Sequence, residues 1–113
     1  MAKYECRLKG NFDEILKLCD DAIIQGSLSA SRENGSDYES NGIRLAVRVY
    51  ERYSAFGGNR VSLSMTLAGN GDDLFLSAIT SGGSRAVFFK INTIGEDRFL
   101  ETLSTAIENY MQG

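Results

Sequence analysis

Apolar and polar residues follow one another along this chain with the two spacings that distinguish strands from helices. Residues 3–9 alternate one by one, as a strand with one buried face does. Residues 12–23 and 99–110 instead carry apolar side chains every three or four positions, as helices with one buried face do. Between these helices the alternation returns in five segments separated by polar or glycine-containing turns: residues 28–32, 43–53, 60–67, 74–81 and 85–91.

This order predicts a single α+β domain over residues 1–113, with its elements in the order β-α-β-β-β-β-β-α. Strands joined by short turns favour an antiparallel meander, with both helices packed on one face. Asn11 is placed to cap the first helix, and the run from Thr93 to Glu96 fits a capping box at the start of the second. Residues 34–42 are polar with a turn signal at each end, so we interpret them as a loop.

The turn around Gly57 suggests how the two longest strands pair. A hairpin centred there would place Val47 beside Leu67 and Val49 beside Met65, on the face under the helices. The opposite, open face would then carry a stripe of basic and aromatic side chains: Arg44, Arg48, Tyr50 and Arg52. Such a stripe could bind an acidic ligand or single-stranded nucleic acid, although charge runs are more often simply solvated.

The last two predicted strands are apolar on both faces, which two helices on one side cannot cover. The residues left on the outer face are Phe75, Ile79, Val87, Phe89 and Ile91. Either a bulge shifts the register here, or these side chains form an apolar patch that binds a partner. The second interpretation makes the chain a non-enzymatic interaction or assembly module, homodimeric through this patch.

A pocket between the sheet and the helices is the alternative. Glu51, Tyr53 and Met65 fall on the predicted inner face, where a carboxylate is costly unless it is paired or in contact with water. These residues could line a pocket for a small apolar ligand. Equally, Glu51 could lie beyond the end of the helices, in solvent.

Composition removes several classes of function. The chain contains no histidine, so Ser-His-Asp and Cys-His nucleophile systems are impossible within it. No convergent set of acid, base and nucleophile is visible, and we expect no catalytic residue, cofactor or metal site. The net charge of −3 argues against non-specific binding to nucleic acid.

Location is predicted from three further absences. The chain has no apolar stretch of the roughly 20 residues that span a bilayer, and its start lacks the apolar run of a signal peptide. The two cysteines occupy unrelated positions, which does not suggest a disulfide framework. We therefore expect a cytoplasmic protein without membrane contact.

Three segments resemble a family of small uncharacterised bacterial proteins, a domain of unknown function. They are residues 47–54, 57–63 and 74–84. The similarity covers most of the chain and implies no established activity. The order of elements is also similar to that of TATA-binding-protein-like and helix-grip folds, which concerns topology alone.

Overall fold

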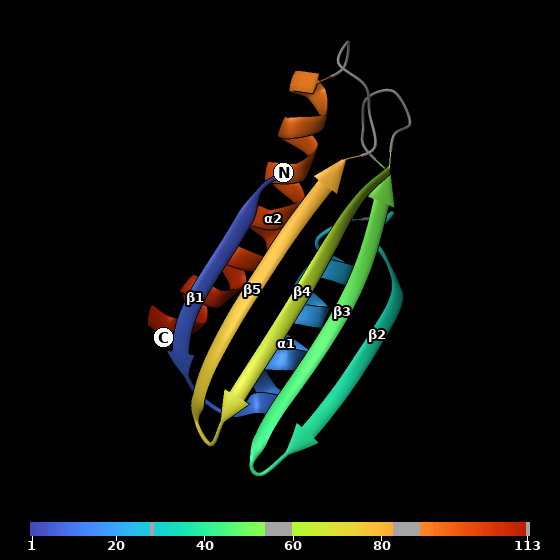
Figure 1. The fold of residues 1–113 in the computed structure, drawn as a ribbon. Coiled ribbons are helices and arrows are strands. Elements are labelled where there is room, and N and C mark those ends of the chain that lie inside the picture. The colour runs from blue at the N-terminus through green and yellow to red at the C-terminus, as the bar shows by residue number, and fades with distance from the viewer. Residues whose placement is uncertain (28, 54–59, 83–88, 113) are drawn as a thin grey trace.

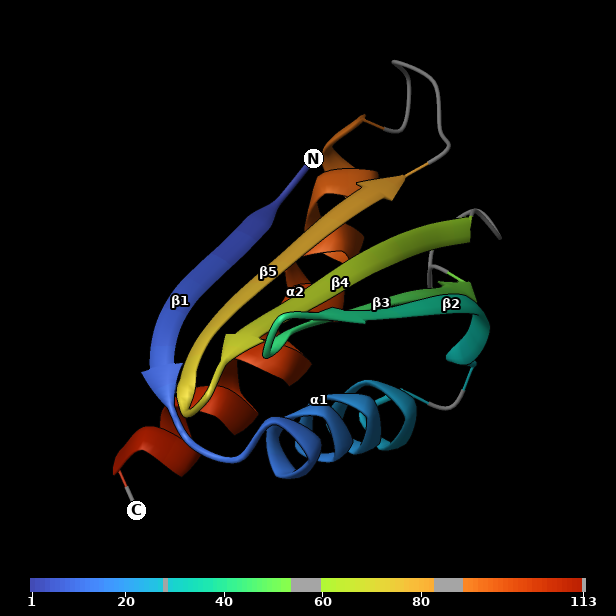
Figure 2. The ribbon, with the colours of Figure 1, turned by 60° about the horizontal axis from the view of Figure 1, so that its bottom comes forward.

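One antiparallel sheet with two helices on a single face forms the fold, as Figures 1 and 2 show. The structure is a computed structural model that describes residues 1–27, 29–53, 60–82 and 89–112, with side chains in the last range described from Phe99 onward. The elements are β1 (Lys3–Lys9), α1 (Phe12–Gln25), β2 (Ser31–Ser40), β3 (Ile43–Tyr53), β4 (Arg60–Asn70), β5 (Asp73–Gly82) and α2 (Phe89–Gln112).

The strand order is β1-β5-β4-β3-β2, and every neighbouring pair is antiparallel. Strands β2 to β5 form the predicted meander, and β1 joins its far edge beside β5. The α+β class and the antiparallel sheet with two helices are therefore confirmed.

The described residues contain five strands, whereas six were predicted. Residues 89–91, assigned to a sixth strand, are the first residues of α2. The capping-box residues Thr93 and Glu96 consequently lie inside that helix and do not start it. Residues 85–88, the rest of the predicted strand, lie outside the described residues.

The predicted loop at 34–42 was also wrong, because most of it belongs to β2. A two-residue turn at Asn41 and Gly42 joins β2 to β3, with φ values of 52° and 82°. Two consecutive residues with positive φ are what a type I′ hairpin turn requires, and Asn-Gly is its preferred sequence. Tyr38 is the only large apolar side chain of β2, so the strand character of β2 cannot be recognised from alternation.

The register between β3 and β4 differs from the predicted one by a single residue. Val47 lies opposite Thr66 and Val49 lies opposite Ser64. Because side chains alternate between the faces of a strand, this shift turns every side chain of β3 to the other side of the sheet. The face assigned to β4 was right, since Met65 is fully buried under the helices.

The core lies between β4, β5 and the two helices. Helix α1 begins at the predicted cap, where the Asn11 side chain accepts a hydrogen bond from the Glu14 backbone N–H at 3.0 Å. The inward side chains of β4 and of both helices supply most of the fully buried residues: Val61, Leu63, Met65, Leu67, Ile15, Cys19, Ile23, Phe99, Leu103 and Ile107. Strands β3 and β5 add Ala46, Tyr50, Leu76, Ala78 and Thr80. This core holds both helices on one face and leaves the other face of the sheet without a covering element in the described part of the chain.

Candidate interaction surface

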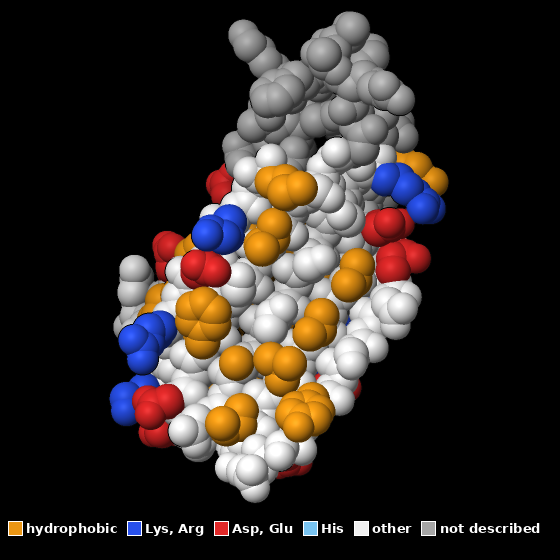
Figure 3. Space-filling model, in the orientation of Figure 1, with side chains coloured by type: hydrophobic (Ala, Val, Ile, Leu, Met, Phe, Trp, Pro, Cys, Tyr) orange, Lys and Arg blue, Asp and Glu red, His pale blue; other side chains and the backbone are white. Residues whose placement is uncertain are grey.

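The sheet face turned away from the helices, here called the open face, carries several groups of apolar side chains with polar side chains between them (Figure 3). We call these apolar side chains together the apolar strip, and its residues are Tyr38, Ile43, Leu45, Val47, Val49, Ala68, Phe75 and Ile79. Tyr38 is 64% exposed and Ile43 is 50% exposed. Exposed apolar side chains gathered on one face make that face the candidate interaction surface of the described part of the chain.

Two of the five predicted interface residues belong to the apolar strip. Phe75 is 39% exposed and Ile79 is 41% exposed, both on the open face of β5. Val87 lies outside the described residues, whereas Phe89 and Ile91 belong to α2 and not to a strand. The patch is thus built with β3 and β2, and not with a sixth strand.

Charged side chains lie at the margins of the open face, and several are paired with one another. On the β1 side, Lys3 contacts Glu5 at 3.7 Å and Lys9 contacts Asp73 at 3.1 Å. At the opposite margin Arg60 contacts Glu51 at 2.9 Å. The basic and acidic side chains on this face balance, and they are Lys3, Arg7, Lys9, Arg60, Glu5, Glu33, Glu51 and Asp73. The acidic excess of the chain therefore lies elsewhere.

A hollow of about 490 Å³ opens on the open face beside Phe75. Its apolar lining includes Ile43, Ala68 and Phe75, and its polar lining includes Arg7 and Asn70. An apolar floor with polar groups at its edge suits a side chain that is apolar along its length and polar at its tip.

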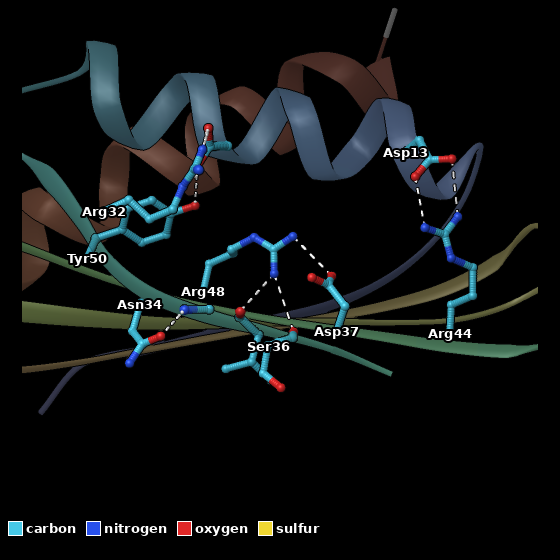
Figure 4. A network of polar contacts seen from close by, with 11 residues as sticks. Asp13, Arg32, Asn34, Ser36, Asp37, Arg44, Arg48 and Tyr50 are labelled. Carbon is cyan, nitrogen blue, oxygen red and sulfur yellow. Dashed lines mark hydrogen bonds and ion pairs between the residues drawn. The ribbon is translucent and has the colours of Figure 1, made fainter. Parts of the chain in front are cut away.

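The basic stripe predicted for the open face lies instead on the inner face, between the sheet and α1 (Figure 4). Arg44 donates two hydrogen bonds to the Asp13 carboxylate of α1, at 2.9 and 3.2 Å, and its guanidinium lies 4.2 Å from the centre of the Phe12 ring. Arg48 donates to Asp37 of β2 at 3.0 Å. These arginines connect β2, β3 and α1, so they do not form an open ligand face.

The other two members of that stripe are further inside. Tyr50 is fully buried, and the Arg52 guanidinium lies 4.8 Å from the centre of the buried Phe99 ring of α2. The prediction was wrong because it assumed that arginines lie on the solvent side of a strand. The long stem of an arginine can cover apolar surface while its charged end reaches a polar partner. A polar pattern on β3 was thus mistaken for a solvent face.

Asp20 of α1 is half-buried and joins β2 and β3 to the helix. Tyr50 donates its hydroxyl hydrogen to the Asp20 carboxylate at 2.7 Å, and Arg32 donates to the same carboxylate through Nε at 3.0 Å and through Nη2. Burial alone would raise the pKa of Asp20, but the hydrogen bonds from Arg32 and Tyr50 outweigh it and lower that pKa. Burial, followed by the bond to Asp20, raises the pKa of Tyr50. At neutral pH the pair is therefore a carboxylate and a neutral phenol.

A family model described as a family of unknown function (DUF6054) matches residues 1–111. The chain belongs to this family. No curated protein matches the chain. The family carries no assigned activity.

The predicted inner pocket is not assembled in this DUF6054 member. Met65 is buried under the helices, whereas Glu51 and Tyr53 lie on the open face, where Tyr53 is 55% exposed. The three side chains point to opposite sides of the sheet and cannot line one pocket. The shift of β3 by one residue separates them. Glu51 is paired with Arg60 at the margin.

The described residues of this family member offer little reactive chemistry. They contain no group of three or more cysteine, aspartate or glutamate side chains that could hold a metal ion. Cys19 is fully buried, and burial raises its thiol pKa to about 12, so it is inert near neutral pH. Cys6 is half-buried, and burial also raises its pKa. Among the described helices none combines the length and the apolar character needed to cross a membrane.

Six residues of the apolar strip were not predicted as surface residues: Tyr38, Ile43, Leu45, Val47, Val49 and Ala68. The signal that could have found Tyr38 is the Asn41-Gly42 dipeptide, because its two-residue turn extends a strand backwards through that position. For β3, both faces carry apolar residues, and only the register with β4 decides which one is buried.

Proposed function

We propose that this DUF6054 member is a non-enzymatic association module that forms homodimers through the open face of its sheet. The observation that carries the proposal is the apolar strip, which crosses β2, β3, β4 and β5 with no described helix over it (Figures 1 and 2). Four of its residues are exposed (Tyr38, Ile43, Phe75 and Ile79), and the other four are half-buried. Such a face is normally covered by another layer, because a sheet needs one on each apolar side.

The size of the face fits this role. Five strands spaced about 4.8 Å apart and about ten residues long make a face of about 24 by 33 Å, or about 800 Å². That area is about what each partner contributes to an interface of standard size. A second sheet could therefore cover the whole strip.

The charge distribution favours a second copy of the same chain. The chain carries a net charge of −3, which opposes self-association through most of its surface. The open face is an exception, because its charges are balanced and lie at the margins. Two copies can approach through this face without placing like charges at the centre of the contact.

Light scattering across a concentration series tests the proposal. We expect the wild-type chain to reach the mass of a dimer as concentration rises, and Phe75→Lys to weaken association about thirtyfold, or about 2 kcal/mol. The control is Tyr110→Lys, because Tyr110 is an aromatic residue of nearly equal exposure, 38% against 39%, on the helix side. It should leave the dissociation constant unchanged.

A wild-type chain that stays monomeric throughout the series would overturn the proposal. Equal weakening by both substitutions would also overturn it, because the contact would then not lie on the open face. Circular dichroism of each variant establishes that a loss of association does not reflect a loss of folding.

A further inference from the structure

One cross-strand row of the open face is self-complementary in size. Strand pairing places Tyr38 of β2, Leu45 of β3, Ala68 of β4 and Phe75 of β5 side by side at one level of the sheet. From β2 to β5 the row therefore contains an aromatic side chain, a large aliphatic one, a small one and a second aromatic one. Its two ends are large, and the two residues in its middle differ in size.

A two-fold axis between β3 and β4, parallel to the strands, would reverse this row in a second copy at the same level. Leu45 would then face the partner's Ala68, so that a large side chain meets a small one. Tyr38 would face the partner's Phe75, and aromatic pairs of this kind are favourable beyond the area that they bury. Each contact occurs twice, as a two-fold interface requires.

The hollow on the open face supports this arrangement independently of the row. Tyr38 is the most exposed member of the apolar strip, and under this axis it would lie over the hollow beside the partner's Phe75. The hollow provides an apolar floor at Ile43 and Ala68 for the ring. Arg7 and Asn70 at its edge provide polar partners for the hydroxyl. In this arrangement the hollow of each copy is filled by Tyr38 of the other copy.

We infer that the partner of the open face is a second copy of this chain related by a two-fold axis between β3 and β4, with Tyr38 of each copy seated in the hollow beside Phe75 of the other. This inference rests on the proposed homodimer and adds its geometry. Other two-fold axes in the plane of the contact place Tyr38 elsewhere. An axis perpendicular to the strands, for example, keeps β2 over the partner's β2.

Cross-linking between two variants that each carry one added cysteine distinguishes these arrangements. Tyr38→Cys and Phe75→Cys are prepared separately with tags of different mass, mixed, and treated with a short bis-maleimide. We expect a cross-linked species with one copy of each variant, and only background cross-linking when either variant is treated alone. The wild-type chain, which retains Cys6 and Cys19 on the helix side, measures the background.

A second pair of cysteine variants leaves both aromatic side chains in place and so controls for any weakening of the dimer by their loss. Leu45→Cys mixed with Ala68→Cys should give the same mixed product, because those positions also face each other under this axis. Cross-linking of Tyr38→Cys with itself would overturn the inferred axis, and so would the absence of both mixed products in a chain that light scattering finds dimeric. A monomeric chain would instead remove the proposed function itself.

Discussion

Replacing Phe99 with alanine is expected to lower the free energy of unfolding by about 4 kcal/mol, the usual size for a fully buried phenylalanine. The Phe99 side chain is completely buried between α2 and the sheet, and its ring also receives the Arg52 guanidinium of β3. Truncation would leave a cavity and remove this stacking partner at once. A chain of 113 residues has a total stability of only about 5–15 kcal/mol, so the loss would be a large fraction of it.

Urea denaturation followed by circular dichroism measures this effect. Tyr110→Ala is the matched control, because it removes an aromatic ring from the same helix at a position that is 38% exposed. It should change the unfolding free energy by less than about 1 kcal/mol. If both variants lost the same stability, Phe99 would not be the residue that holds α2 against the sheet.

Replacing Asp20 with alanine is expected to cost about 2 kcal/mol, because the buried Tyr50 hydroxyl would lose its hydrogen-bond acceptor. Tyr50→Phe should cost less, about 1 kcal/mol, since Asp20 would keep Arg32 as a partner. Denaturation of both single variants and of the double variant measures the coupling. Additive losses would contradict a direct interaction between the two side chains.

The Asp20 contribution should also depend on pH with a defined sign. The folded-state pKa of Asp20 is lowered relative to its unfolded value of about 3.9, so the unfolded chain takes up the proton more readily. The stabilisation is therefore fully present above about pH 4 and is lost as the pH falls through the folded-state pKa. The stability difference between wild type and Asp20→Asn should shrink in acid. A difference that stays constant between neutral pH and about pH 3 would contradict this assignment.

The position of the helices and strands could be predicted from the sequence better than which face of each element is buried. The alternation in β1 and β4 and the helical spacing in α1 each pointed to the correct buried side, because in those elements one face is apolar and the other polar. In β3 both faces contain residues that can be buried. An error of one residue in the predicted register of β3 exchanged its inner and open faces. The candidate site residues of β3 were therefore all assigned to the wrong face.

The predictions for the two ends of the meander were wrong for different physical reasons. Strand β2 carries one large apolar side chain, Tyr38, and is otherwise polar. It is an edge strand, and its inner residue Asp37 meets the Arg48 guanidinium and not hydrocarbon. The segment from Phe89 alternates like a strand over its first residues, yet it is helical in the structure. Short apolar runs do not distinguish a buried strand from a buried helix, and the tertiary context decides between them.

The Asn41-Gly42 turn has a consequence for the association surface. Because Tyr38 is the only large apolar side chain of β2, sliding the strand along β3 would lose little hydrophobic burial. The length of this turn and the Arg48–Asp37 pair therefore set its position. One residue inserted there would carry Tyr38 to the helix side without altering any residue of the contact itself. For the proposed homodimer, the length of this loop in other members of the family is therefore as informative as the side chains on the open face of their sheets.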